Sequence, residues 1–368
     1  MQQKCQKARA PHTGYSARIK HWCKQQTLLQ YHIAKRARER HRCERYWIAM
    51  RLPALCCCLA AAVPLLVKAA EDAPPSGEDW YGDDTWVVVV GASRYFANYR
   101  HAGNALAVRK AARRFGVPRD RILVLLAEDP TLDARNPLKG EVYLHANAPF
   151  EDNLAMDDDG TYVDVDYSNE EVTPELVRNL LTGRYDADTP RSKRLDSNAQ
   201  SNLFIYMTGH GGDEFLKFHD ADELSAKELA LTFAEMKAKQ RFKRCVLVVD
   251  TCQAGSLFKH LDNSTSGILA LASARVGENA YASPADATTG VALADRFTEQ
   301  AIRWLESTGA DATWGAFVDA LRRAPTRSTL EVHDAAWGEG DWRRAPVRAF
   351  LGDPPRPEHA LRPWEDDL

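Results

Sequence analysis

Cysteine is scarce in most of this sequence, and its scarcity argues against two classes of protein. Eight cysteines occur in 368 residues, but six of them lie before residue 59, so only Cys245 and Cys252 remain in the rest of the chain. Two cysteines cannot form the dense disulfide framework of a small secreted domain. No close pair of the CxxC type accompanies them, which argues against a zinc site that Cys252 would share with His210.

Long apolar runs are also missing after residue 70. No stretch there approaches the roughly 18 apolar residues of a membrane-spanning helix, so the mature chain is expected to lack one.

Positive charge is also scarce after residue 70, because residues 71–368 carry 34 Lys and Arg against 49 Asp and Glu, a net charge of -15. We predict no nucleic-acid partner for this part of the chain.

The first 49 residues have the opposite balance. They hold twelve Lys and Arg and two Glu, without a hydrophobic period, and segments of this composition are disordered. Residues 1–49 are therefore either a basic targeting or nucleic-acid-binding arm, or upstream sequence that is not translated, with Met50 as the true start.

Residues 50–69 have the layout of a secretory signal peptide. An apolar stretch at 52–67 follows Met50 and one arginine, and small residues surround a cut near Ala69. The alternative is a membrane anchor within 52–67, but sixteen residues with two prolines are short for a span. The remaining chain is divided into an acidic linker at 70–85, a folded domain at 86–351 and a loose polar tail at 352–368.

The folded domain is predicted to be of the α/β class. Strands are expected at 86–92, 121–127 and 267–273, and two more end near residues 208 and 250; helices are expected at 102–115, 173–182, 225–240, 295–307 and 313–323. The strands lack polar alternation, which is typical of parallel strands buried on both faces. We therefore expect a mainly parallel sheet with helices on both faces, and a last edge strand at 345–351.

Reactive residues follow two of these strands. His210 comes directly after the first and Cys252 after the second, and one helix-length segment separates the strands, so both should meet at one edge of the sheet. A thiolate with a neighbouring imidazole is a nucleophile for acyl transfer. Asn98 could orient the imidazole, and the N–H groups of Gly211 and Cys252 could stabilise an oxyanion. The alternatives are a tight turn with a surface histidine and an unrelated strand-end thiol.

An aspartate-rich segment lies between the second and third predicted strands, at 150–167. Carboxylates at short spacing, such as Asp164 and Asp166, suit a hard cation such as calcium. The spacing does not match an EF-hand, and the spacing alone favours the alternative of a solvated acidic hairpin.

The motifs around the reactive residues resemble the legumain-like cysteine peptidases of the caspase-fold clan. The matching segments are Asn98-Tyr99-Arg100-His101, Thr208-Gly209-His210-Gly211-Gly212 and Val248-Val249-Asp250-Thr251-Cys252-Gln253. Residues 189–195 and 206–218 are similar to the branch of that family that attaches glycosylphosphatidylinositol (GPI) anchors. The resemblance covers residues 86–298 and implies a caspase-like three-layer sandwich.

The resemblance also implies roles for individual residues. Cys252 would be the nucleophile, His210 its base and Asn98 the third member of the site. The pocket for the residue before the scissile bond would be lined by Arg100, Asp250 and Ser273. Asp164 and Asp166 resemble part of a structural calcium site, although Arg119 replaces a further acidic ligand. No cofactor would be required.

The implied reaction removes the C-terminal signal of a precursor protein and transfers the new C-terminus to the ethanolamine amine of a GPI lipid. The implied partners are other membrane subunits of a complex, the precursor's signal and the GPI lipid. The chain would reside in the lumen of the endoplasmic reticulum, held at the membrane by those subunits, because it ends at Leu368 without a transmembrane helix.

Two other functions stay open. The first is a free asparaginyl endopeptidase of the legumain type, although the tail after Arg323 has no room for the prodomain usual in those enzymes. The second is a non-catalytic luminal interaction subunit, against which the presence of Asn98, His210 and Cys252 argues.

Overall fold

The computed structural model describes residues 80–262, 265–308, 312–338 and 340–352. The basic segment 1–49, the signal peptide 50–69, most of the linker 70–85 and nearly all of the tail 352–368 lie outside these residues, and their assignment stays a prediction. Within the described part, no helix has both the length and the apolar character needed to cross a membrane.

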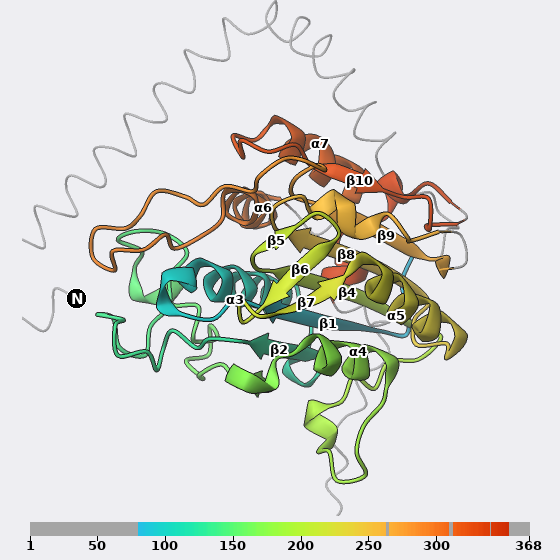
Figure 1. The fold of residues 1–368 in the computed structure, drawn as a ribbon, viewed down its shortest axis with the longest axis horizontal. Helices are drawn as coiled ribbons and strands as arrows, with labels where there is room; N and C mark the ends of the chain where they lie inside the picture. The colour runs from blue at the N-terminus through green and yellow to red at the C-terminus, as the bar shows by residue number, and fades with distance from the viewer. Residues whose placement is uncertain (1–79, 263–264, 309–311, 339, 353–368) are drawn as a thin grey trace, which may run out of the picture. The chain divides into compact units, whose positions relative to one another are not determined.

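A seven-stranded sheet forms the middle layer of the domain (Figure 1). Its strands, in spatial order, are β10 (Glu331–His333), β9 (Ile268–Ala272), β8 (Arg244–Asp250), β4 (Ser201–Thr208), β1 (Asp84–Gly91), β2 (Ile122–Leu126) and β3 (Tyr167–Ser168). Every neighbouring pair is parallel except β10 and β9. The prediction of an α/β fold with a mainly parallel sheet is confirmed.

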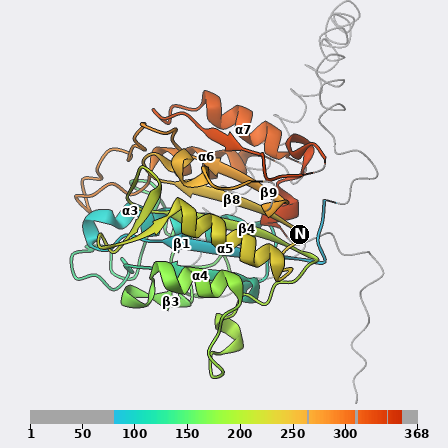
Figure 2. The same ribbon diagram turned by 45° about the vertical axis from the view of Figure 1, so that its right-hand side comes forward.

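Helices cover both faces of this sheet, which makes three layers (Figure 2). On one face lie α3 (Tyr99–Arg114), α6 (Arg296–Ser307), α7 (Trp314–Arg323) and the short α8 (Arg348–Leu351); on the other lie α4 (Pro174–Thr182) and α5 (Ala226–Ala238). Alternate residues of β1 enter the two cores, so Val87 and Val89 face α3 while Val88 and Val90 face the opposite layer.

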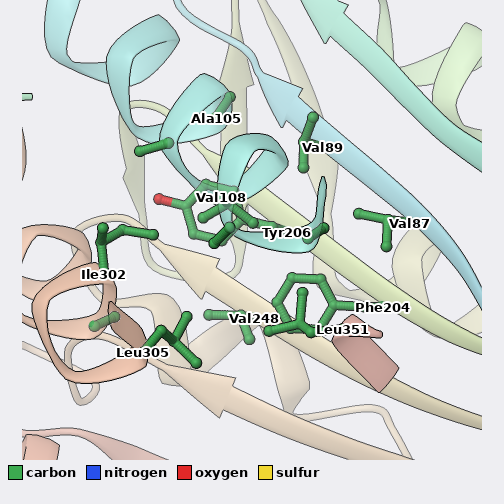
Figure 3. Close-up of a cluster of buried hydrophobic side chains, with 14 of the residues drawn as sticks. Val87, Val89, Ala105, Val108, Phe204, Tyr206, Val248, Ile302, Leu305 and Leu351 are labelled. Atoms are coloured by element: carbon green, nitrogen blue, oxygen red, sulfur yellow. The ribbon is translucent and has the colours of Figure 1, made fainter. Parts of the chain in front are cut away.

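The first core is visible in Figure 3, where side chains from α3 and α6 meet those of the central strands. Ala105 and Val108 of α3 pack with Val89, Tyr206 and Val248, all of them at most 5% exposed. Burying a side chain of the valine or leucine type stabilises a fold by about 1.5–3 kcal/mol. The sheet edge that carries the reactive residues is therefore anchored in a large apolar core.

Local sequence signals explain where the helices begin. Thr173 accepts the N–H of Leu176 at the start of α4, and Pro174 occupies the first helical position. Ser225 and Glu228 form a reciprocal capping box at the start of α5. Short 3-10 helices connect other segments: η2 (Phe96–Asn98), η3 (Arg119–Arg121), η4 (Phe150–Asp152), η5 (Asn169–Glu171), η6 (Arg191–Lys193), η7 (Ala254–Phe258) and η9 (Trp342–Arg344).

The predicted edge strand at 345–351 is wrong. The edge position beside β9 is taken by β10, whereas residues 348–351 form α8. The N–H groups of Phe350 and Leu351 both donate to the carbonyl of Val347, so this apolar run satisfies its backbone locally and buries its side chains as a helical turn.

A small antiparallel sheet between β4 and α5 was not predicted. It consists of β5 (Gly211–Gly212), β6 (Phe215–Phe218) and β7 (Asp222–Ser225), in that order. Strands of two to four residues are too short to show a period in the sequence. This sheet begins one residue after His210 and so forms part of the loop that carries it.

Candidate active site

His210 and Cys252 stand at equivalent positions beyond neighbouring strands. The last residue pair between β4 and β8 joins Thr208 to Asp250, and each reactive residue lies two positions further along its chain. Parallel neighbours are about 4.8 Å apart, and their carboxyl ends share one edge of the sheet. The structure thus brings the predicted nucleophile and the predicted base to the same edge, as expected from the strand, helix, strand order.

Asn98 holds the imidazole of His210 in one orientation. Its Nδ2 donates to the carbonyl of Arg94 at 2.6 Å, so its Oδ1 faces the Nε2 of His210 at 2.9 Å. The amide oxygen can only accept, and Nε2 must therefore carry the proton when the imidazole is neutral. The lone pair of Nδ1 is then the basic position of His210.

The surroundings of His210 favour this neutral form. Burial is the main cause that lowers the pKa of His210 below 6.5, and the Arg100 guanidinium adds to the effect. A neutral imidazole at the pH of a cell compartment is ready to take a proton from a thiol. A second imidazole, that of the buried His101, meets the ring of His210 edge-on, with centroids 5.1 Å apart, and burial lowers the pKa of His101 far below 6.5.

The two cysteines differ in the way predicted for a nucleophile and an inert thiol. Cys245 in β8 has no exposed surface, and burial raises the pKa of its thiol. Cys252 is partly exposed, with its Sγ 3.9 Å from the carbonyl oxygen of Ala280. The next residue, Gln253, has a left-handed backbone (φ 53°, ψ 28°) and directly precedes η7, so the chain turns sharply just after the thiol.

The N–H groups of Gly211 and Cys252, the predicted oxyanion donors, take no part in the hydrogen bonds of the described sheets. In the pairing of β5 with β6, Gly211 faces Leu216, and the carbonyl of His210 accepts from the N–H of Lys217. Gly211 is thus at a non-hydrogen-bonded position of an antiparallel pair, and its N–H points away from β6. Within the described residues, the N–H of Cys252 has no hydrogen-bond acceptor.

The three predicted pocket residues lie in one polar network, but they differ in exposure. Arg100 is partly exposed and its Nε donates to Asp295 at 3.1 Å. Asp250 is 1% exposed and accepts from the hydroxyl of Thr298 at 2.7 Å. Ser273 is fully buried, and its hydroxyl accepts the N–H of Thr251 at 3.2 Å, so it holds the backbone next to Cys252.

Asp295 is the member of this network that sequence reasoning missed. Its carboxylate accepts from Arg100 and, at 2.7 Å, from Asn104. Burial raises the pKa of Asp295. Burial also raises the pKa of Asp250, to about 7, and the negative charge of Asp295 adds to this rise. In the sequence, Asp295 stands only at the start of the predicted helix 295–307. An aspartate at that position is expected as a helix-capping residue, so it does not indicate a role in the site.

The aspartate-rich segment is held by arginines. Asp157 is 7% exposed and receives two hydrogen bonds from Arg109, at 2.6 and 3.1 Å, and one from Arg119 at 2.7 Å. Of the two residues predicted to bind calcium, Asp164 is exposed, and Asp166 accepts the N–H of Val124 at 2.8 Å.

Calcium takes six to eight oxygen ligands. Among the described residues, no group of three or more acidic, histidine or cysteine side chains could hold a metal ion. Calcium binding by Asp164 and Asp166 stays a prediction.

Comparisons with known proteins show the family to which the sequence is similar. Residues 85–353 match the model of the peptidase C13 family. Over 223 residues, which are 61% of this chain and 54% of the relative, the sequence is 43% identical to a GPI-anchor transamidase of Bos taurus. It is 38% identical to the GPI-anchor transamidase of Saccharomyces cerevisiae over 230 residues, 62% of this chain and 54% of the relative.

A Drosophila melanogaster protein is 39% identical over 271 residues, 73% of this chain and 74% of that protein. The chain thus spans about half the length of the cattle and yeast relatives that it matches. Among solved structures, caspase-1 of Spodoptera frugiperda aligns with a TM-score of 0.44 and 8% sequence identity, over 71% of this chain and 90% of that one.

Proposed function

The chain belongs to the peptidase C13 family, and from this premise we propose that it is the catalytic subunit of a GPI transamidase. It is an enzyme of the cysteine peptidase type, and several of its relatives are named GPI-anchor transamidase. The proposed reaction cleaves the C-terminal signal of a precursor and joins the new C-terminus to the ethanolamine amine of a GPI lipid. The proposal places the chain in the lumen of the endoplasmic reticulum, with other membrane subunits as partners.

The observation that carries the proposal is the hydrogen bond between His210 and Asn98 at the sheet edge that also bears Cys252. It leaves the lone pair of Nδ1 as the base. In the first step, Nδ1 of His210 takes the proton of the Cys252 thiol, and the thiolate attacks the carbonyl carbon of the scissile peptide bond. The N–H groups of Gly211 and Cys252 stabilise the oxyanion, and each such donor contributes about 10²–10³ in rate.

The intermediate collapses when its C–N bond breaks. The imidazolium of His210 returns its proton to the leaving amine, and the precursor remains attached to Cys252 as a thioester. In the second half of the reaction, the ethanolamine amine attacks the thioester carbonyl and gives a proton to His210. An amide forms, the C–S bond breaks, and the thiolate takes the proton back.

Arg100, Asp250 and Asp295 supply polar recognition next to the scissile bond. Arg100 is the most accessible of them, and Asp295 and Asn98 both lie within hydrogen-bond distance of its guanidinium. A pocket with one cationic group and two buried acidic groups favours a small polar side chain over a large apolar one. Ser273 is fully buried and supports this pocket through the hydrogen bond that its hydroxyl accepts from the N–H of Thr251.

Hydrazine tests the proposal, because a small amine can replace the GPI lipid as acceptor. Microsomes that contain the full chain and a precursor with a GPI signal should release a precursor hydrazide, whose mass distinguishes it from the acid. Cys252→Ala should abolish the hydrazide, and Cys245→Ala, which changes the other thiol of the domain, should retain it. A hydrazide formed by Cys252→Ala would refute the nucleophile. A free carboxylate without any hydrazide would indicate an ordinary endopeptidase.

A further inference from the structure

The two loops that carry His210 and Cys252 need a defined relative position, yet their backbones are not joined. The ladder between β4 and β8 ends at the pair of Thr208 with Asp250. Within the described residues, no backbone hydrogen bond connects residues 210–216 to residues 251–258. Catalysis by a thiol and an imidazole requires their atoms to approach within hydrogen-bond distance, so other contacts must hold the loops.

Thr251 makes the first of these contacts. Its hydroxyl donates to the carbonyl oxygen of Gly209 at 2.9 Å, and only 2% of its surface is exposed. The same side chain packs on Gly211, where an added Cβ would lie 2.5 Å from Oγ1 and 3.1 Å from Cγ2 of Thr251. The side chain that precedes the thiol therefore touches the chain on both sides of His210.

Ser256 makes the second contact, in the turn of η7 after the thiol. Its Oγ accepts the N–H of Glu214 at 2.7 Å. Its hydroxyl proton can be donated to the backbone carbonyl oxygen of Gln253 at 2.8 Å or to that of Gly212 at 3.3 Å. Its side chain is also 2% exposed. The two buried hydroxyls thus connect the cysteine loop to the histidine loop at two places, one before and one after Cys252.

We infer that Thr251 and Ser256 are positioning residues, whose hydroxyls set the distance and direction from His210 and the Gly211 N–H to Cys252. The inference deepens the proposed function and rests on it. Neither hydroxyl reaches the substrate; each acts through the loop it holds. Because a misplacement of about 1 Å in a reacting group can cost roughly 10²-fold in rate, loss of the Thr251 hydroxyl should lower turnover while the affinity for the precursor stays unchanged.

The test compares Thr251→Val, which removes the hydroxyl at constant shape, with Thr251→Ser, which keeps it. In the assembled complex, the valine variant should form hydrazide about 10- to 100-fold more slowly at an unchanged KM, and the serine variant should be restored to within a few fold of the parent. Thr232→Val is a matched control, since Thr232 is also 2% exposed and donates to a backbone carbonyl, that of Glu228 at 2.8 Å, within α5.

Alkylation of Cys252 by iodoacetamide provides a second readout, with Cys252→Ala as the blank. At a fixed neutral pH, alkylation should be slower in Thr251→Val and remain at the parent rate in Thr232→Val, because a displaced imidazole no longer accepts the proton of the thiol. If Thr251→Val does not assemble, Ser256→Ala should show the same slower turnover and the same slower alkylation.

Parent-like turnover and an unchanged alkylation rate in both hydroxyl variants would overturn the inference, provided that Cys252→Ala is inactive. A rise in KM alone would overturn it too, since that indicates a substrate contact. Activity that persists in Cys252→Ala would instead overturn the proposed function itself, so the two failures are distinguishable.

Discussion

Replacing Asp250 with asparagine should make the domain more stable above neutral pH and leave its stability near pH 4 almost unchanged. Asp250 lies at the end of β8 with 1% of its surface exposed. Burial, followed by the charge of Asp295, raises the pKa of this carboxyl from 3.8 to about 7, although hydrogen bonds from Thr298 and Ser273 act in the opposite direction. In the folded protein, the carboxyl therefore keeps its proton up to neutral pH.

The pH window follows from the two pKa values of Asp250. Below about pH 4 the carboxyl is protonated in both the folded and the unfolded chain, and its ionisation costs no stability. Between pH 4 and 7 only the unfolded chain releases the proton, so the free energy of unfolding falls by about 1.4 kcal/mol for each pH unit. Above pH 7 the loss is constant, on the order of 4 kcal/mol for a fully buried group. Asparagine does not ionise and avoids this loss.

Urea denaturation followed by tryptophan fluorescence measures the difference directly. The free energy of unfolding of Asp250→Asn minus that of the parent should increase steadily from pH 4.5 to 7 and then level off. Asp188→Asn, which removes an exposed carboxylate, is the control and should show a flat difference. A constant difference for Asp250→Asn over the whole range would refute the reasoning, since it would mean that Asp250 is ionised in the folded protein at acidic pH.

Two further predictions concern the orientation of His210 and the arginines of the aspartate-rich segment. Asn98→Ala should lower kcat by roughly 10-fold or more because the imidazole of His210 loses its hydrogen-bond partner. Asn98→Asp keeps an acceptor and adds a negative charge that raises the pKa of His210, so the acid limb of the plot of kcat against pH should move to higher pH. An acid limb at the same pH in Asn98→Asp and in the parent would contradict this. Arg109→Met should destabilise the fold by about 3–5 kcal/mol in urea, because it leaves Asp157 buried without its main partner. Adding Asp157→Asn should recover part of that loss, and an undiminished loss in the double variant would argue against a charge effect.

The parts of this fold that could be predicted are those with a period or a chemical boundary. The strands at 86–92 and 121–127 are continuous apolar runs that end in small or polar residues, and β1 and β2 lie within one or two residues of those ranges. Thr173 with Pro174 and Thr313 mark helix starts that the structure reproduces. Such signals are local, because capping and burial act on neighbouring residues.

The parts that could not be predicted depend on contacts between distant segments. Residues 345–351 are as apolar as a strand, and only the presence of β10 at the sheet edge decides that 348–351 become α8. Asp295 joins the site because the start of α6 is packed against α3, where Asn104 and Arg100 donate to its carboxylate. No spacing in the sequence connects residue 295 to residue 100.

The equal offset of His210 and Cys252 from the last β4–β8 pair explains why the order of the strands was sufficient to predict that both residues lie at one edge of the sheet. In parallel strands, register determines which residues stand at the same height, and side chains alternate between the two faces. A slip of one residue in β4 would move His210 by about 3.3 Å along the strand direction and exchange the apolar residues of its two faces. Both faces of the sheet are buried under helices, so a slip would disrupt the packing of both apolar cores. The packing that stabilises the sheet therefore also keeps His210 and Cys252 at the same distance beyond the ends of β4 and β8.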